Sequence, residues 1–359
     1  MYKHLLLAAS FSVVGFASAH AQTFPSTSFD NSAKITQTGN LHTATIDQAV
    51  NGELNGQNQA EIAQSGNRNA SVINQSNATS PMANSRFANI ADVTQIRSRN
   101  DASIDQVHDY ARINRNLAVV LQQGIEGDAV IQQRGDSNVA RILQRNTSAA
   151  PIARIEQNGR TNTAQVEQFA GSSGEVTVIQ GAFGNGLILS PQTLLSKVDV
   201  EQAGQNADIY ISQIGSSQVA NVVEGGVNGI TDIRMEGALN RADVAQFSQN
   251  GLIAIASTAG SFSNQATVTQ GVTDNGSSAF VQQSGSNAFS EIEQLGGGGG
   301  LNGNFADVTQ SGNGLGANAV LSSVFQDGSI NEARITQVSG YAESFVSQFG
   351  TGHLTTVIQ

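Results

Sequence analysis

Residues 138–144 read NVARILQ, and residues 162–168 read NTAQVEQ. In both stretches Asn, Ala, Ile or Val, and Gln stand at alternate positions, and each stretch ends at a glutamine, Gln144 or Gln168. A period of two is typical of a β-strand with one buried face. The pattern Ala-x-Ile-x-Gln recurs through almost the whole chain, commonly at eleven-residue steps. Repetition on this scale predicts a stacked array of short structural units.

The last position of each repeat, which is usually a glutamine, is here named the anchor. Ile, Val or Leu stands two positions before every anchor, a small residue such as Ala commonly stands four before it, and Asn often stands six before it. These alternate positions lie on one face of a strand. Charged residues such as Arg141 and Glu167 fall at the intervening positions. The anchor face is therefore predicted to be buried and the other face to meet solvent.

Glycine commonly follows the anchor by two positions, as at Gly135 and Gly159. Glycine tolerates the positive φ that a tight arc needs, and a later Asn can hydrogen-bond the backbone that leaves the turn. One strand and one arc take eleven residues, so two of each return the chain above its start. The sequence therefore predicts an all-β fold, a two-sheet β-solenoid of 22-residue coils (strand-arc-strand-arc) with amyloid-like stacking. Wider spacings predict loops inserted at arcs.

Inward amides must satisfy one another, because a buried amide without a partner costs about 1–3 kcal/mol. Stacking allows the N–H of one amide to meet the carbonyl of the same residue in the next coil. The end of such a ladder could pair with a further copy of the chain, and residues 353–359 leave no room for a cap. End-to-end polymerisation is therefore predicted, through ladder residues Gln37, Gln48, Gln133, Gln144, Gln157, Gln168, Gln337, Gln348, Gln359, Asn138, Asn162 and Asn331.

Four anchors are not glutamine, namely Pro191, Glu224, Met235 and Ser257. Counted alternately, Pro191, Met235 and Ser257 fall on one sheet, and proline cannot donate to a strand ladder. Two interpretations stay open. The substitutions are either neutral drift in a long repeat or a gatekeeper region that slows premature assembly.

The composition narrows the functional classes. The net charge of −11 argues against a nucleic-acid partner, and the absence of Cys excludes disulfides and thiolate metal sites. His42, His108 and His353 are far apart in repeat order, so neither a metal site nor an acid–base pair is expected. No cofactor is predicted. An enzyme of the parallel β-helix kind is the least favoured interpretation, and we expect that the chain is not an enzyme.

Residues 1–21 have the pattern of a secretory signal. Lys3 precedes an apolar run, and Ala19-His20-Ala21 offers a cleavage site after Ala21 or after Ala19. The apolar run is too short to span a membrane, and no membrane span is predicted elsewhere. A short segment follows at residues 22–32, and the repeats occupy residues 33–359. The mature protein is expected to be secreted.

The motifs QRGDSNVARILQ (residues 133–144) and QNGRTNTAQVEQ (residues 157–168) resemble the curlin repeat of bacterial curli fibres. The resemblance extends over residues 33–359 and is nearer to the minor, nucleating curlin than to the major subunit. It implies a structural subunit or nucleator of an extracellular amyloid fimbrium that supports cell adhesion and biofilm matrix. The implied partners are other copies, other curlin subunits, and the outer-membrane curli secretion channel with its accessory proteins.

A second interpretation is a cell-surface solenoid that does not polymerise and binds polysaccharide. Ice binding would need a regular outward row of Thr, and the outward positions are too varied for it. Phe280, Phe325 and Phe345 are predicted to face outward, where they could contact neighbouring fibres.

Overall fold

The computed structural model describes residues 8–15, 32–50, 58–77, 88–108, 115–145, 150–169, 172–181, 196–258, 261–272, 275–296, 303–313, 320–338 and 342–359. All regular elements in these ranges are strands, so the all-β prediction is confirmed. The chain divides into two compact units, Met1–Ala170 (unit 1) and Gly171–Gln359 (unit 2). In each unit the odd-numbered strands form one sheet, the odd sheet, and the even-numbered strands form the other, the even sheet.

The described residues of unit 1 form twelve strands. Its odd sheet consists of β1 (Ala8–Gly15), β3 (His42–Val50), β5 (Ala70–Asn77), β7 (Asp101–His108), β9 (Asp128–Asp136) and β11 (Ile152–Arg160). Its even sheet consists of β2 (Ser32–Asn40), β4 (Gln59–Asn67), β6 (Ala88–Ser98), β8 (Arg115–Gln123), β10 (Val139–Arg145) and β12 (Thr163–Gln168).

In the part of unit 2 that the structure describes there are fifteen strands. Its odd sheet consists of β13 (Glu175–Gln180), β15 (Asp208–Ser216), β17 (Ile230–Ala238), β19 (Leu252–Ser257), β21 (Ser278–Ser286), β23 (Phe305–Asn313), β25 (Glu332–Gln337) and β27 (Leu354–Ile358). Its even sheet consists of β14 (Lys197–Gln202), β16 (Val219–Glu224), β18 (Arg241–Gln246), β20 (Gln265–Gln270), β22 (Ala288–Gly296), β24 (Val320–Ser329) and β26 (Ala342–Thr351).

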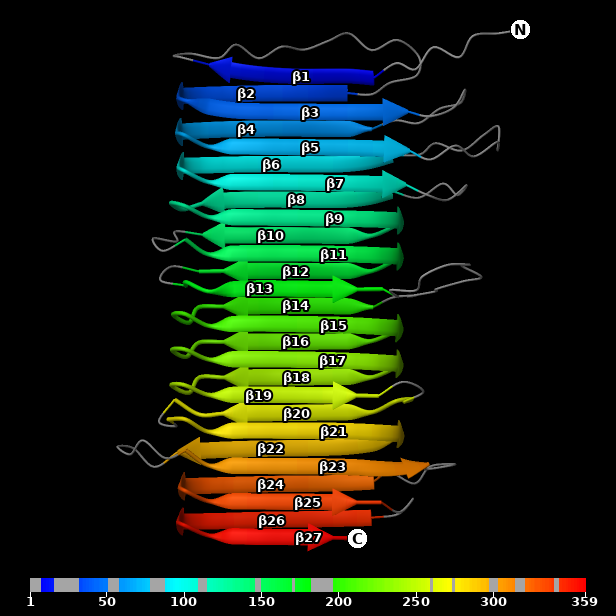
Figure 1. Ribbon diagram of the computed structural model, residues 1–359, viewed down its shortest axis with the longest axis vertical. Coiled ribbons are helices and arrows are strands. Elements are labelled where there is room, and N and C mark those ends of the chain that lie inside the picture. Colours follow the sequence, from blue (N-terminus) through cyan, green and yellow to red (C-terminus); the bar gives the residue numbers. More distant parts are fainter. Residues whose placement is uncertain are drawn as a thin grey trace, which may run out of the picture. The chain divides into compact units, whose positions relative to one another are not determined.

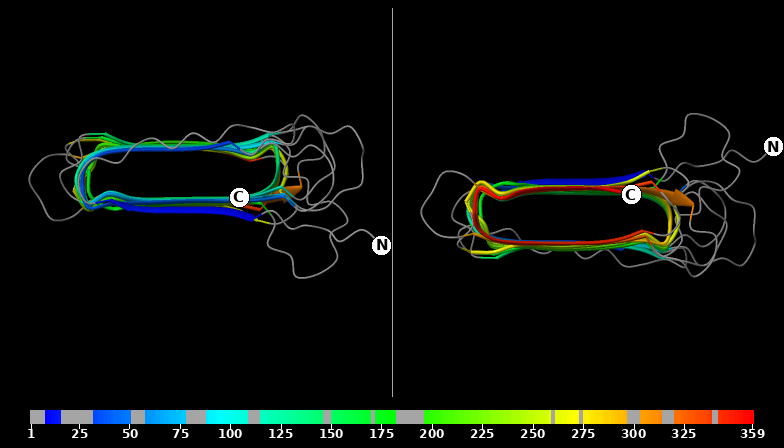
Figure 2. Two further views of the ribbon diagram at one scale, coloured as in Figure 1. Left: turned by 90° about the horizontal axis from the view of Figure 1, so that it is seen from above. Right: turned by 90° about the horizontal axis from the view of Figure 1, so that it is seen from below.

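Odd and even strands alternate along each unit (Figure 1), and within a unit they superpose into two facing layers joined by arcs (Figure 2). Apart from β1, the described strand pairs are parallel and place anchor beside anchor, as with Gln122, Gln144 and Gln168. The step between stacked anchors is 22 residues from Gln122 to Gln144 and 27 from Gln37 to Gln64. The extra residues lie between strands, so insertions leave the register intact. Two parallel sheets stacked as a β-solenoid confirm the predicted fold.

The core of each unit is a thin layer between its two sheets. The aliphatic residue two positions before the anchor is buried, as are Ile131, Ile142 and Ile255, and the small residue four positions before it is buried, as are Ala129 and Ala140. The small residues let the facing sheets approach closely. Burying a Val or Ile side chain contributes about 1.5–3 kcal/mol relative to leaving it exposed. Repeated over many coils, this layer replaces the aromatic core that the composition lacks.

Many of the described arcs contain two residues with left-handed backbone conformation. The first is the predicted glycine, for example Gly135 with a φ of 117°, where a Cβ would collide with the backbone carbonyl oxygen of Gly159 in the next coil. The second lies two residues later and is often not glycine, as at Ser137 and Thr161. A positive φ is uncommon for such residues. This second position could not be recognised in the sequence, because residues as different as Leu41, Arg68 and Ser137 occupy it.

Strand β1 is antiparallel, unlike the other strand pairings described. It pairs along the edge of β3, from Ala8 opposite Ala49 to Gly15 opposite His42. This segment belongs to the predicted secretory signal, residues 1–21. In the full chain the signal segment therefore covers the edge of β3. Cleavage of the signal stays a prediction.

The expected alternation fails at one step. Counting eleven residues places Gln180 and Gln202 on the same sheet and Pro191 on the sheet of Met235. Instead β13 pairs directly with β15, which stacks Gln180 on Gln213, and Gln202 lies in the even sheet. The described strands thus depart from strict alternation between Gln180 and Gln202. Pro191 itself lies outside the described residues.

Candidate functional site: amide ladders and strand edges

Two continuous glutamine ladders run through unit 1. In each step the Nε2 of one anchor donates to the Oε1 of the next, at distances of 2.7–2.9 Å. The even ladder extends from Gln37 to Gln168 and the odd ladder from Gln48 to Gln157. Every amide donates toward its C-terminal neighbour. Each ladder is therefore polar, with an acceptor at its N-terminal end and a donor at its C-terminal end.

The second amide hydrogen of each anchor crosses to the facing sheet. Gln133 donates to the backbone carbonyl of Leu117 at 3.0 Å, and Gln144 donates to that of Asp128 at 3.0 Å. The sequence predicted bonds along the ladder but not these bonds across the core. An anchor thus joins its own sheet to the next coil and to the opposite sheet at the same time.

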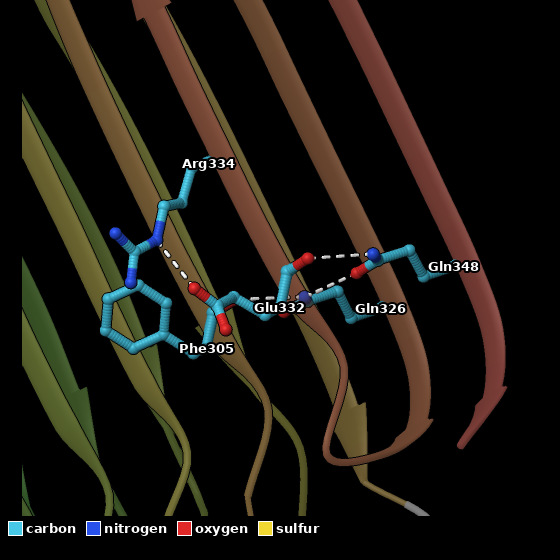
Figure 3. A network of polar contacts seen from close by, with 5 residues as sticks. All are labelled: Phe305, Gln326, Glu332, Arg334 and Gln348. Atoms are coloured by element: carbon cyan, nitrogen blue, oxygen red, sulfur yellow. Dashed lines mark hydrogen bonds and ion pairs between the residues drawn. The ribbon is translucent and has the colours of Figure 1, made fainter. Parts of the chain in front are cut away.

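Figure 3 shows both kinds of bond in unit 2. Gln326 donates to Oε1 of Gln348 at 2.7 Å and to the backbone carbonyl of Phe305 at 3.0 Å, and Gln348 donates to the carbonyl of Glu332 at 2.9 Å. On the outer face Arg334 pairs with Glu332 at 2.6 Å and lies 5.5 Å from the centre of the Phe305 ring. Strands β23 and β25 therefore take part both in hydrogen bonds inside the core, through the carbonyls of Phe305 and Glu332, and in side-chain contacts on the outer face.

Some asparagines pair amide to amide between coils as predicted, for example Asn89 with Asn58 and Asn116 with Asn89, each at 3.2 Å. Asn138 and Asn331 bond the backbone instead. The Oδ1 of Asn138 accepts the backbone N–H of Asn162 at 3.2 Å, and its Nδ2 donates to arc carbonyls. Asn331 does the same, accepting the backbone N–H of His353 at 3.2 Å. An Asn side chain is one methylene shorter than Gln and reaches the nearby arc backbone. These predicted ladder residues thus fix the arcs, and their amides do not pair with one another at these steps.

The predicted irregular anchors of unit 2 interrupt its odd ladder. Met235 and Ser257 are buried at successive steps between Gln213 and Gln283. A Met side chain has no N–H donor, and Ser is too short to carry the ladder. The ladder resumes at Gln283, whose buried Oε1 is among the described polar atoms without a partner. From there it continues through Gln310 and Gln337 to Gln359.

Glu224 interrupts the even ladder of the same unit. Its side chain is fully buried, and Oε1 accepts the backbone N–H of Gly226 at 3.0 Å. Oε2 is buried and, within the part of the chain that the structure describes, has no partner. Burial raises the pKa of Glu224 to about 7, and the bond from Gly226 lowers it in part. The carboxyl group is therefore poised to change charge near neutral pH.

Thr231 compensates for the donor that Glu224 lacks. An ionised carboxylate has no hydrogen to give to the next anchor, Gln246. The Oγ1 of Thr231 donates to Gln246 Oε1 instead, at 2.8 Å. Thr231 stands at a position where the repeat commonly has Ala, four residues before Met235. The sequence alone did not single it out, because its partner belongs to the opposite sheet.

The outer edges of the two units differ in what covers them. Among the described residues β2 pairs only with β4, β26 only with β24, and β27 only with β25, whereas β3 is covered by β1. At the β2 edge the Oε1 of Gln37 is buried and, in the described region, has no hydrogen-bond partner. At the other edge Gln348 donates to a carbonyl and to Thr355 Oγ1 at 3.1 Å, and to no further glutamine in the described chain.

The described residues contain neither a cluster of metal ligands nor a membrane-spanning helix. No group of three or more His, Cys, Asp or Glu side chains is placed to hold a metal ion, and no helix there is long and apolar enough to cross a membrane. No known protein-family model matches the chain, and no curated protein is significantly similar to it.

Proposed function

We propose that this protein is a structural subunit or nucleator of an extracellular, curli-like amyloid fimbrium, which grows by end-to-end stacking of copies. The single observation that carries the proposal is the polarity of the ladders. The even ladder of unit 1 begins at an acceptor without a partner, Gln37 Oε1. The even ladder of unit 2 ends at a donor, Gln348 Nε2, which in every regular step of a ladder would meet the Oε1 of another glutamine.

A junction between copies would place β2 of one copy beside β26 of the previous one. If anchor meets anchor, Gln348 donates to Gln37, and the open backbone groups of both edge strands pair. In that register Lys34 lies beside Phe345, because each stands three residues before its anchor. Both side chains are exposed on the outer face. The ammonium group and the ring would form a cation–π contact, which contributes about 0.5–1 kcal/mol at exposed sites.

The odd sheets would join at the same junction, β27 of one copy beside β3 of the next. In the full chain β1 occupies the edge of β3. Removing residues 1–21 would free this edge. The proposal therefore couples export to assembly, since the segment that directs secretion also blocks one of the two strand edges needed for growth.

The signal pattern of residues 1–21 supports secretion, and the resemblance of the repeats to the curlin repeat supports the proposed partners. The chain would leave the cell through an outer-membrane curli secretion channel with accessory proteins, and then stack on itself and on other curlin subunits. The fimbrium would support adhesion and biofilm matrix. The repeat that carries the resemblance is the same one whose anchors form the polar ladders.

The test is fibre formation by the chain that begins at residue 22. We expect seeded growth into fibres whose diffraction has reflections near ~4.8 and ~10 Å. The Gln348→Glu variant keeps the oxygen that accepts from Gln326 and loses the donor. It should therefore elongate about tenfold more slowly, which corresponds to about 1.4 kcal/mol at the barrier. Ser347→Ala, at the exposed neighbouring position, should elongate as the parent chain does.

Elongation rates are measured from seeded growth at fixed seed mass, followed by light scattering and by sedimentation. A chain that stays monomeric for days and does not seed would refute the proposed function. Equal slowing by Gln348→Glu and Ser347→Ala would leave fibres in place but refute the ladder as their junction.

A further inference from the structure

An open trough of about 500 Å³ lies on the solvent face of the odd sheet of unit 2. Its floor is β19, where Ala254 and Ala256 point outward. An alanine rises by a single carbon, so the longer side chains of the neighbouring strands stand above it on both sides. The register sets Asp232 and Arg234 of β17 on one side of the two alanines. It sets Phe280 of β21 beside Ala254 on the other.

The β17 wall consists of a planar charged pair. Arg234 Nε lies 3.1 Å from Asp232 Oδ1, and Arg234 Nη2 lies 2.9 Å from Asp232 Oδ2. The Cζ atom of the Arg234 guanidinium lies 5.5 Å from the centre of the Tyr210 ring. A guanidinium has five N–H donors, and this bidentate pair uses two of them. The wall therefore presents rigid donors and acceptors in one plane.

The β21 wall combines an aromatic ring with an amide. The Phe280 ring is held by Phe305, with ring centres 5.7 Å apart and planes tilted by 43°. Gln282 lies beside Ala256 and is exposed, so it offers both a donor and an acceptor. Beyond this wall, β23 contributes Asp307 and Thr309 to the lining of the trough. The β21 wall thus presents the flat apolar ring of Phe280, and the β17 wall presents the flat polar pair of Asp232 and Arg234.

We propose that this trough binds a neutral polysaccharide chain. Pyranose rings have apolar C–H faces, which fit against an aromatic ring and an alanine floor, and hydroxyl edges, which suit planar side chains with paired donors and acceptors. The volume lies within the range of small-molecule sites in proteins, about 300–1,000 Å³. The net charge of −11 and the neutralised Arg234 disfavour an anionic polymer.

The shape of the trough favours an extended chain over a single sugar. Its lining takes three residues from β19, Ala254, Ile255 and Ala256, and extends across four strands, β17, β19, β21 and β23. Neighbouring strands lie about 4.8 Å apart, so the four strands cover roughly 14 Å across the sheet, whereas three residues cover about 7 Å along a strand. In a fibre every copy would contribute one trough, and a polysaccharide that spans several copies would gain avidity from weak individual sites.

The experiment is affinity electrophoresis of the full chain in native gels that contain one polymer at a time. The polymers are hydroxyethylcellulose and a galactomannan, both neutral, and polygalacturonate, which is anionic. The double variant Ala254→Ile/Ala256→Ile fills the trough with residues that suit a strand. Ala245→Ile is the matched control, because Ala245 is an outward, half-exposed alanine of β18 in the other sheet. Phe280→Ala removes the apolar wall.

We expect a neutral polymer to retard the parent chain and Ala245→Ile equally, and both trough variants to bind at least about tenfold more weakly. Far-UV circular dichroism checks that every variant is folded. The proposal is overturned if neither neutral polymer retards the parent chain, if only polygalacturonate does, or if the filled variant binds as well as the control. In another outcome, the filled variant binds the glycan as the parent chain does but its fibres no longer bundle. The trough would then be a contact with a second copy, and the proposal of glycan binding would also be overturned. Retardation does not require fibres, so this test and the test of assembly can fail separately.

Discussion

The Gln133→Ala variant is expected to lose about 3–5 kcal/mol of the free energy of unfolding of unit 1. The Gln133 side chain is buried and makes three hydrogen bonds. It accepts from Gln106 at 2.8 Å, donates to Gln157 at 2.8 Å and donates to the Leu117 carbonyl at 3.0 Å. Truncation leaves buried polar groups of these partners unsatisfied and opens a cavity between the sheets. Each such group costs about 1–3 kcal/mol.

The matched control for this variant is the preceding residue. Gln132 has the same side chain but is exposed on the outer face of β9. Gln132→Ala should change stability by no more than about 0.5 kcal/mol. Guanidinium chloride denaturation followed by far-UV circular dichroism measures both. Equal losses for the two variants would mean that the inward amides contribute no more than ordinary surface residues, and the ladder account of stability would fail.

The Glu224→Gln variant is expected to stabilise unit 2 by about 3 kcal/mol at pH 8 and by little at pH 4. In the folded protein the pKa of Glu224 is raised from 4.5 to about 7. The folded state therefore holds the proton more tightly than the unfolded state does. The stability from protonation is complete below pH 4.5 and is lost as the pH rises to about 7. A shift of this size corresponds to about 3 kcal/mol.

Glutamine at position 224 cannot ionise, and it supplies the N–H that the ladder toward Gln246 needs. The variant should therefore show neither the decline in stability between pH 4.5 and 7 nor the ladder interruption. Glu201→Gln is the control, because Glu201 is exposed on the outer face of the neighbouring strand β14, and it should keep the pH dependence of the parent chain. Denaturation midpoints at several pH values test this. A parent chain whose stability does not decline over this interval would contradict the buried, poised carboxyl.

The irregular anchors bear on the gatekeeper interpretation. Glu224 breaks the even ladder, and Met235 with Ser257 breaks the odd ladder, at neighbouring steps of unit 2. Thr231 supplies a hydrogen bond that repairs one side of the break. The same kind of bond occurs where the ladder is intact, from Ser71 Oγ to Gln95 and from Ser290 Oγ to Gln310, each at 2.7 Å. Thr231 therefore does not distinguish a maintained interruption from neutral drift, and both interpretations stay open. The role in slowing assembly stays a prediction, and the Glu224→Gln chain offers its direct test through the lag before fibre growth.

The trough could not have been predicted as a site from the sequence. Phe280 could be assigned to the outer face from its place in the repeat, and so could Asp232 and Arg234. Counting anchors alternately also places Met235, Ser257 and Gln283 at successive steps of one sheet, as the structure has them. The repeat pattern does not encode how the outward side chains lie, so the pairing of Arg234 with Asp232 and the open space above the two alanines required the structure. The ladder residues were predictable because their partners are copies of themselves in the next coil, whatever the loop length.

The sequence by itself determined the strand faces, the glycine of the arcs and the stacking of anchor on anchor, because each follows from the alternation of side chains within one repeat. Tertiary structure alone decided the bonds of Gln133 and Gln144 across the core, the backbone partners of Asn138, the pairing of Thr231 with Gln246 and the stacking of Gln180 on Gln213. It also decided that β1 lies against β3. These features join residues from different coils or different sheets. They depend on the register between distant segments, and a periodic pattern, being the same in every coil, cannot specify which coil meets which.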